Sequence, residues 1–524
     1  MNSIIDTIAR WAFELEYNDI PGRIIEKARM QVLNIIAAVL SGRYCGALEP
    51  MGSVNLPDGA ATVIMGGRKT NAENAAFINA LYSMSFDFDD YLFMGHTGHS
   101  SVLVPLALAE EKDLNVKALL LAQVVTNEVE GRLGASVLLG HHNGQMWSYI
   151  HTAGAAAAAS KLLGLSKEQT ASAIALSLYQ PNYPLAPGFM MSDSKLLTAS
   201  IPIVSGMMCA KLAQAGMKGN AGLLEAENGF LSRFAYLPLP HMLSGLGAWW
   251  VTDTIAFKPY PGCAYIDTSV DGAFRIMDEV KRKTGKSLET TEIRHIDVFA
   301  NMLTMGMNAL SEMYDDGTLH PVNINFSIPK SVAIAILNKS LRAGHLSSEA
   351  LGKDEQAIKS LSQRIKLYHD WRYTLKTQAS FYGSLGGKFV LDGIGFFKLI
   401  NAFRSMRRDL PSMPFNLMGL LKAWRTLPAR EKHTIRRGIM KKDDYVKMDG
   451  FTFSFGARVR LEMNDGQVYE AESIIPRGAS DMDRKQVVME KLADALDSED
   501  KANALYGLLN PQTPAREFMK SILK

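Results

Sequence analysis

Three segments of the chain concentrate side chains that can transfer protons. In the first, residues 86–101 (FDFDDYLFMGHTGHSS), acids precede histidines beside glycines. A carboxylate next to an imidazole orients the ring and tunes its pKa, so this order is typical of an acid–base site. The same residue types also bind metal ions or cap helices, so acid–base, metal-binding and structural interpretations stay open. The side chains concerned are Asp87, Asp89, Asp90, His96 and His99.

The second segment, residues 143–151 (NGQMWSYIH), comes just before an alanine-rich run. If that run is a helix, Gln145, Trp147 and His151 can line a cleft at its start, where a helix N-terminus favours anions. The alternative for His151, beside Tyr149, is a packed and hydrogen-bonded core residue. The segment therefore predicts a carboxylate-binding position without excluding a structural one.

Two lysines form the third group. Lys195 lies in MMSDSKLLTAS before an apolar helical stretch, and Lys258 lies in AFKPYPGC, where the pattern of the chain changes. A partly buried lysine can pair with a carboxylate, or lose its proton and act as a base. Its more common fate is to lie along the surface with the ammonium group in water.

Helices must position these groups in the first half of the chain, where apolar residues recur at helical spacing. The alanine-rich run has high helix propensity, and its small side chains let a neighbouring helix approach closely. Ser166 and Gln169 then form a capping-box pattern that begins the next helix. The predicted helices cover residues 24–40, 74–85, 102–111, 116–129, 153–163 and 201–216, with a further short helical stretch at 221–225.

The pattern becomes strand-like after Trp250. Residues 292–299, 451–461 and 468–474 are extended by their alternation, and Asp465-Gly466 between the last two predicts a tight hairpin turn. The fold class is therefore mixed α and α+β, with a large all-helical domain and a smaller α+β domain. The predicted division is a helical domain at 1–255, an α+β domain at 256–480 with a basic insertion near 380–440, and C-terminal helices at 481–524 that pack back on the helical domain.

Composition narrows the function classes. A net charge of +3 over 524 residues gives no general case for nucleic acid as a partner. The three cysteines are far apart and favour a reducing, cytoplasmic compartment rather than a disulfide or zinc framework. The N-terminus lacks the pattern of a secretory signal, and no uninterrupted apolar stretch predicts an integral membrane segment.

One stretch of the chain is strongly basic, although the net charge of the whole chain is small. Residues 401–442 hold eleven Lys or Arg against two acids, after an apolar and aromatic run at 389–403. The stretch is interpreted as a solvated basic face on an inserted helical pair, with a membrane-surface or partner-binding helix as the alternative.

Six stretches, in shared order, resemble the MmgE/PrpD family, which includes 2-methylcitrate dehydratase, cis-aconitate decarboxylase and iminodisuccinate epimerase. The resemblance covers roughly residues 1–335 and 450–490. The stretches are LNIIAAVLSG (33–42), NAAFINALYSMSFDFDDY (74–91), GHSSVLVPLALAE (98–110), AAAAASKLLGLSKEQ (155–169), SDSKLLTASIPIVSGMMCAKLAQAGMKGNAGLLEAENGF (192–230) and FKPYPGCAYIDTSVDGA (257–273).

The resemblance implies a helical domain beside an α+β domain, a homodimer, and catalysis on a carboxylate-rich substrate in a cleft without metal or organic cofactor. By position, Asp87 matches the first acid of the family's DFDD motif, and His99 matches the histidine of its HPS motif, here His-Ser-Ser. Lys195 matches the lysine that follows the alanine-helix region, and Lys258 that of its KxYPxC-like motif. These four are the predicted catalytic residues.

We place Asp90, Ser101, Gln145 and His151 at substrate-binding positions. The chain departs from the family where Gln145, Asp267 and Lys330 stand in place of two histidines and a tyrosine. The predicted function is dehydration or hydration of a small di- or tricarboxylate by a lyase. Epimerisation or isomerisation is the second reaction and decarboxylation the third, and a non-catalytic scaffold is the remaining alternative.

Overall fold

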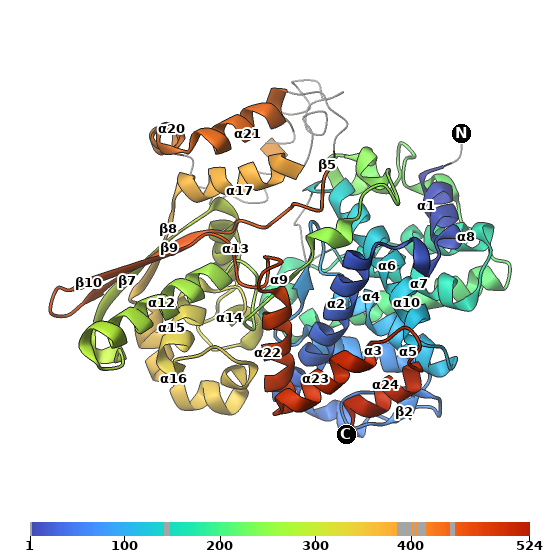
Figure 1. Cartoon of the computed structure of the whole chain (residues 1–524), viewed down its shortest axis with the longest axis horizontal. Helices are drawn as coiled ribbons and strands as arrows, with labels where there is room; N and C mark the ends of the chain where they lie inside the picture. Colours follow the sequence, from blue (N-terminus) through green and yellow to red (C-terminus); the bar gives the residue numbers. More distant parts are fainter. Residues whose placement is uncertain (1–2, 141–146, 385–400, 402–403, 406–415, 441–445) are drawn as a thin grey trace.

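Two large apolar cores organise the structure, a computed structural model that describes residues 3–140, 147–384, 401, 404–405, 416–440 and 446–524. The larger core lies among helices of the first half of the chain, and the smaller one lies against a four-stranded sheet. Figure 1 shows these as two halves of the molecule, with the C-terminal helices against the first. The predicted fold class, a large helical part beside a smaller α+β part, is confirmed.

The first half is a layered set of helices. α10 packs against α3, α7 and α8, and α6 packs against α7. The buried alanines of α7 let these neighbours approach closely, because a methyl group adds little width to a helix. The helices are α1 (Ile4–Glu14), α2 (Gly22–Ser41), α3 (Ala72–Met84), α4 (Gly98–Ser101), α5 (Leu103–Glu111), α6 (Val116–Ser136), α7 (Ser148–Leu163), α8 (Lys167–Tyr179), α9 (Ala186–Met191), α10 (Leu197–Gln214) and α11 (Phe230–Phe234).

The segment Asp193–Gln214, which includes α10, has the length and apolar composition of a membrane span. However, 56% of its apolar window is buried inside the protein. The contacts of α10 with α3, α7 and α8 account for this apolar character, because a core helix needs such a surface on several sides.

The second half is built on a mixed sheet with the order β10-β9-β7-β8. β9 pairs antiparallel with β10 and β7, whereas β7 and β8 run parallel. α12 covers β9 and β10, and α15 packs on α12 and β8. The elements are α12 (Asp267–Thr284), β7 (Ile293–Ala300), α13 (Met302–Met313), α14 (Pro321–Ile324), α15 (Ile328–Asn338), α16 (Ser348–Ser362), β8 (Ile365–His369), α17 (Trp371–Ser384), α20 (Leu417–Thr426), α21 (Ala429–Met440), β9 (Ala457–Met463) and β10 (Val468–Ser473).

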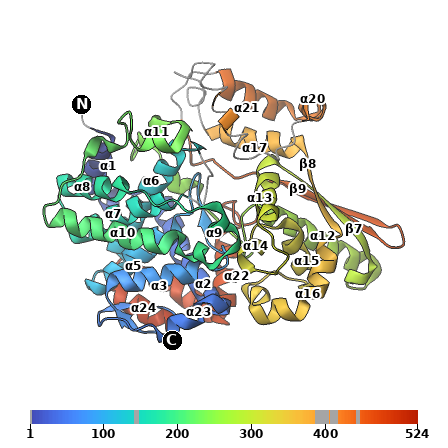
Figure 2. The same cartoon turned by 180° about the vertical axis from the view of Figure 1, so that it is seen from behind.

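The chain then returns to the first half. α22 (Arg484–Leu496) packs on α2, α23 (Glu499–Leu508) packs on α22 and α2, and α24 (Ala515–Ile522) packs on α5. Figure 2, the view from behind, shows the same placement of the C-terminal helices against α2, α3 and α5.

Short strand pairs tie distant segments together. β3 and β6 join the first segment of acids and histidines to the beginning of the second half. The pairs are β1 (Ala61–Thr62) with β2 (Lys69–Thr70), β3 (Asp90–Tyr91) with β6 (Ala256–Phe257), and β4 (Leu139–Gly140) with β5 (Ala235–Leu237).

Most predicted elements are present with shifted ends. The capping box at Ser166 and the hairpin turn at Gly466 are confirmed. The alanine-rich helix begins at Ser148, so the expectation that His151 precedes it was wrong. The strand predicted at 451–461 begins only at Ala457, because the phenylalanines before it fill the first core instead of joining the sheet.

Candidate active site

The acid segment runs along the boundary between the two cores. Phe86 and Phe88 are buried in the second core. Asp87 and Asp89, which alternate with them, are also fully buried but meet charged partners. Asp87 has a φ of 55°, a left-handed conformation that aspartate tolerates better than most residues. Successive side chains of this short loop therefore lie alternately in an apolar and in an ionic environment.

Lys258 is brought to this loop by the β3–β6 pair. Asp90 pairs with Phe257 across the two strands, which places the next residue, Lys258, beside the acids. Its Nζ lies 2.7 Å from the Asp87 carbonyl oxygen, 3.2 Å from Asp87 Oδ2 and 2.5 Å from Asp89 Oδ1. One ammonium group thus holds two carboxylates and a backbone carbonyl.

Lys195 approaches Asp87 from another direction. It lies on the single turn Asp193–Leu196 that leads into α10, and its Nζ is 2.8 Å from Asp87 Oδ1. The rings of Phe189 and Phe326 lie 5.5 and 5.3 Å from the same nitrogen. The ammonium group is thereby buried with one carboxylate and two aromatic faces.

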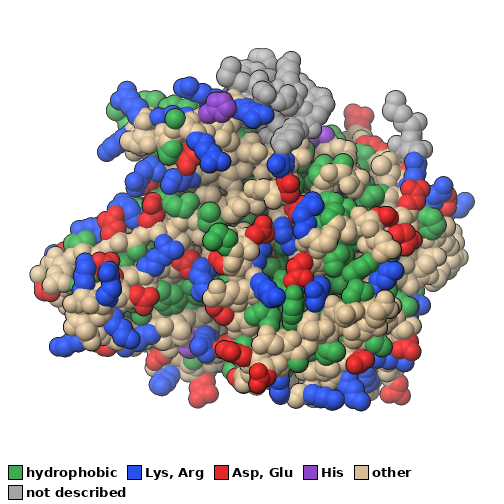
Figure 3. All heavy atoms as spheres, viewed as in Figure 1, with side chains coloured by type: hydrophobic (Ala, Val, Ile, Leu, Met, Phe, Trp, Pro, Cys, Tyr) green, Lys and Arg blue, Asp and Glu red, His purple; other side chains and the backbone are tan. Residues whose placement is uncertain are grey.

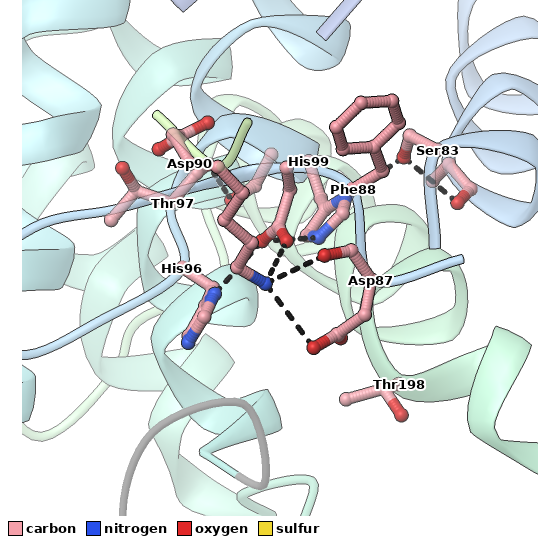
Figure 4. A network of polar contacts seen from close by, with 12 residues as sticks. Ser83, Asp87, Phe88, Asp90, His96, Thr97, His99 and Thr198 are labelled. Atoms are coloured by element: carbon pink, nitrogen blue, oxygen red, sulfur yellow. Dashed lines mark hydrogen bonds and ion pairs between the residues drawn. The ribbon is translucent and has the colours of Figure 1, made fainter. Parts of the chain in front are cut away.

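Two imidazoles meet on a single oxygen of Asp89. Figure 4 shows these two rings, His96 and His99, near Asp87. Oδ2 lies 2.9 Å from His96 Nδ1 and 3.1 Å from His99 Nε2. Because an ionised carboxylate only accepts hydrogen bonds, these ring nitrogens donate to it. His99 Nδ1 then faces the Ser83 hydroxyl at 2.8 Å, which fixes both edges of the ring.

Pairing decides the charge of this cluster. Burial by itself raises the pKa of both acids, but Lys195 and Lys258 outweigh it at Asp87, and Lys258 with the histidines outweighs it at Asp89, so both pKa values are lowered. Burial also disfavours the Lys258 ammonium, yet the two aspartates outweigh it and raise its pKa. Burial lowers the pKa of His99 despite Asp89. The cluster thus holds ionised acids, charged Lys258 and a neutral His99.

A second group of buried polar side chains adjoins the first. The Ser100 hydroxyl lies 2.8 Å from His151 Nδ1 and 2.5 Å from Glu130 Oε1. The His151 ring is 6.0 Å from the His99 ring, centre to centre, in an edge-on arrangement. Burial raises the pKa of Glu130 well above its usual value, and burial with the nearby His99 lowers that of His151. Burial thus favours the neutral form of both groups.

The predicted catalytic residues Asp87, His99, Lys195 and Lys258 come together in this region, and His151 lies beside them. Asp90 is buried with one oxygen 2.8 Å from Gln31 Nε2, and its other oxygen has no hydrogen bond to the described residues. The Ser101 hydroxyl is buried without a partner in the same described part of the chain. Gln145 lies outside the described residues.

The four predicted catalytic side chains form a packed cluster, and they line neither of two grooves found in the described part of the molecule. Both grooves are lined by residues that flank the cluster in sequence. These are Ser85, Asp193 and Leu196 in a groove of about 390 Å³, and Phe88 and Pro259 in a groove of about 510 Å³. The four side chains lie close together, as expected. However, they do not surround either of these grooves. A substrate needs a local opening to reach them.

Sequence reasoning did not assign roles to Asp89 and Glu130. The DFDD pattern contains Asp89, but only the fold shows that it joins Lys258 to both histidines. Glu130 lies inside α6, and no local pattern marks it. Within the described ranges, no group of three or more His, Cys, Asp or Glu side chains is arranged to hold a metal ion.

Two departures from the family pattern have different environments. Both Asp267 oxygens are buried without a hydrogen bond to a described residue, and burial, with Asp271, raises its pKa well above the usual value. Lys330 Nζ lies 2.7 Å from Asp315 and 3.0 Å from Asn323. Asp267 is therefore a neutral acid, whereas Lys330 is bound in an ion pair.

Comparison with known proteins finds one family model and several relatives that are similar to this chain. Residues 6–238 match the family model described as the MmgE/PrpD N-terminal domain. The N-terminal part of the chain is thus similar to the MmgE/PrpD N-terminal domain. The matched region contains Asp87, His99, His151 and Lys195, whereas Lys258 lies beyond its end.

Several relatives carry the name cis-aconitate decarboxylase. One from Aspergillus terreus is 26% identical over 324 residues, which cover 57% of this chain and 64% of that protein. Another, from Aspergillus terreus strain NIH 2624 / FGSC A1156, is 23% identical over 69% of this chain and 77% of its own length. The human protein is 27% identical over 50% of this chain and 57% of its own length. The match thus spans less than two thirds of the first and third relatives.

Proposed function

We propose that this chain is a lyase that acts on a small di- or tricarboxylate at the cluster of Asp87, Asp89, His99, Lys195 and Lys258. The observation that carries the proposal is the arrangement of two buried ammonium groups and an imidazole around two adjacent carboxylates. Buried charges of this kind are expensive to maintain, so their concentration at one point favours a chemical role.

Decarboxylation is the reaction we place first. The names of the relatives favour it over the dehydration that the family resemblance suggested. Loss of carbon dioxide breaks a carbon–carbon bond and leaves the electron pair on the substrate, next to a remaining carboxylate. Lys195 and Lys258 would stabilise this negative charge, because fixed cations in a water-excluded site interact strongly with it.

A proton must then reach the carbon atom that lost carbon dioxide. We assign its delivery to His99, which would first take up a proton from solvent. Asp89 accepts from Nε2 and would stabilise the imidazolium form that then gives the proton to carbon. The neutral imidazole is equally suited to remove a proton from carbon, which is the first step of dehydration or epimerisation. The substrate would enter from the groove beside Ser85 and Leu196 and replace part of the pairing between Lys195 and Asp87.

The test is an assay of the purified protein in deuterated water with cis-aconitate and, separately, with citrate. Decarboxylation releases carbon dioxide and leaves one solvent deuteron on the product. Dehydration gives a new enoate, and epimerisation exchanges a proton without net conversion. Absence of all three outcomes with these and related polycarboxylates contradicts the proposal.

The matched variants are His99→Ala and His369→Ala. Removing a general acid–base group costs on the order of 10²–10⁴ in rate, so turnover should fall by that factor in the first variant. His369 is half-buried on β8 and bonds to Thr374, so its loss should leave turnover unchanged. Near-normal turnover of a folded His99→Ala protein would refute the assignment.

A further inference from the structure

The helical pair α20 and α21 is an appendage with its own small core. Among the described elements, α20 and α21 pack mainly on α17, through a cluster that includes Leu375, Ala379, Ala423, Leu427 and Ile435. Figure 1 shows the pair projecting above the sheet. Its outer surface is therefore not needed to complete either large core.

The exposed side of α20 is apolar where a solvated helix would be polar. Leu417, Met418 and Leu421 are 56%, 76% and 47% exposed. Residues 418, 421 and 425 follow one another at helical spacing, so Met418 and Leu421 share a face with the exposed Arg425. The helix thus has two apolar surfaces, one against α17 and one toward solvent.

Basic side chains surround this apolar face. In the part of α20 and α21 that the structure describes, Lys422, Arg425, Arg430, Arg436 and Arg437 are exposed, and none of them forms an ion pair with a described residue. Some exposed basic residues elsewhere are paired, such as Arg342 with Asp494 and Arg477 with Glu490. Figure 3 shows blue basic and green apolar side chains next to one another over this projecting corner.

Basic residues are concentrated in the part of the sequence that contains α20 and α21. Residues 401–442 carry eleven Lys or Arg and two acids, while the whole chain has a net charge of only +3. The rest of the chain is therefore net negative. A basic surface on an otherwise acidic protein orients the molecule toward a polyanion, because attraction acts at this face and repulsion at the others.

We infer that α20 and α21 form a docking surface for an anionic lipid bilayer, on which the enzyme sits peripherally. Unpaired cations would contact the phosphate and carboxylate headgroups, while Leu417, Met418 and Leu421 enter the headgroup–acyl boundary. The exposed leucines and methionine favour a bilayer over RNA, which is bound by basic residues with aromatic or planar stacking partners. A second copy of the same face is disfavoured, since it would bring like charges together.

The experiment is flotation of the full-length protein with phosphatidylcholine vesicles, with and without phosphatidylserine. The protein should bind only the vesicles that contain phosphatidylserine, and less at high salt. Each lost Lys or Arg contact weakens binding about fivefold. The double variant Arg425→Glu/Arg436→Glu should therefore bind more than tenfold more weakly, and Met418→Ser/Leu421→Ser should also lose binding.

The control changes the same net charge elsewhere. Arg282 and Lys353 are exposed on α12 and α16 and form no ion pair with a described residue, so Arg282→Glu/Lys353→Glu should keep most of the binding. Equal losses in both charge variants would overturn the inference, as would absence of binding to phosphatidylserine vesicles or stronger binding to single-stranded RNA than to vesicles. Unchanged turnover on soluble substrate and an unchanged melting temperature verify that each variant is folded.

Discussion

Two sets of carboxylates, buried to the same degree, have pKa values that are shifted in opposite directions in this protein. Asp87 and Asp89 lie against lysines, and their pKa values are lowered. Asp90 and Glu130 lie close by without a lysine contact, and burial is the main cause of their raised pKa values, to about 7 for Asp90. The comparison shows that contact with Lys195 and Lys258, and not burial, decides which carboxylates have a lowered pKa.

Glycines make room for the neutral set. A methyl group at Gly98 would lie 2.0 Å from Asp90 Oδ1, and one at Gly154 would lie 1.7 Å from Glu130 Oε1. Neither distance is possible for real atoms, so both carboxyl groups occupy space that any larger residue would fill. The neutral acids are thus accommodated by packing, whereas the ionised acids are held by charge.

The largest expected effect comes from removing the cation that the ionised set shares. Lys258→Met leaves Asp89 without an ammonium partner and Asp87 with only Lys195. Breaking a buried ion pair from one side costs ~3–5 kcal/mol of unfolding free energy. Urea unfolding at pH 7 should show this loss, together with loss of turnover. Unfolding free energy equal to that of the unmodified protein would mean that the cluster is hydrated and open.

A pH-dependent effect is expected for Asp90→Asn. The pKa of Asp90 rises from 3.8 in the unfolded chain to about 7, so the folded state holds a proton that the unfolded state has lost. Native stability therefore falls as pH rises between these values, by about 1.4 kcal/mol per pH unit. Asparagine removes this term, so the variant should gain about 2–3 kcal/mol relative to the parent protein from pH 5 to pH 7.

Chemical unfolding of both proteins at a series of pH values measures this difference. The curves should separate as pH rises and become parallel above pH 7. A constant difference across the range would show that Asp90 is ionised when folded.

The smallest effect is expected for Glu130→Gln, compared with Asp89→Asn. Glu130 is already neutral, and an amide oxygen can still accept from Ser100, so unfolding free energy should change by less than about 1 kcal/mol. Asp89→Asn deprives Lys258 of a charged partner and should cost several times more. Similar losses in the two variants would remove the distinction between charged and neutral acids.

Local features of the fold were predictable because their causes are local. Ser166 and Gln169 form their capping box within one turn, and Asp465-Gly466 closes its hairpin between adjacent strands. The N-terminal end of α7 was not predictable from local sequence. The alanine run marked the body of this helix, but the residues before it joined it because α6 and α10 bury that face.

The sequence by itself determined the set of reactive groups, since Asp87, His99, Lys195 and Lys258 stand in stretches that resemble one family. Only the tertiary structure decided which charged side chains contact one another. Lys258 reaches Asp89 over 169 positions, and Glu130 reaches Ser100 from another helix. Coulomb energy and desolvation depend on distances through space, so the protonation states of a buried site follow from packing and not from spacing along the chain.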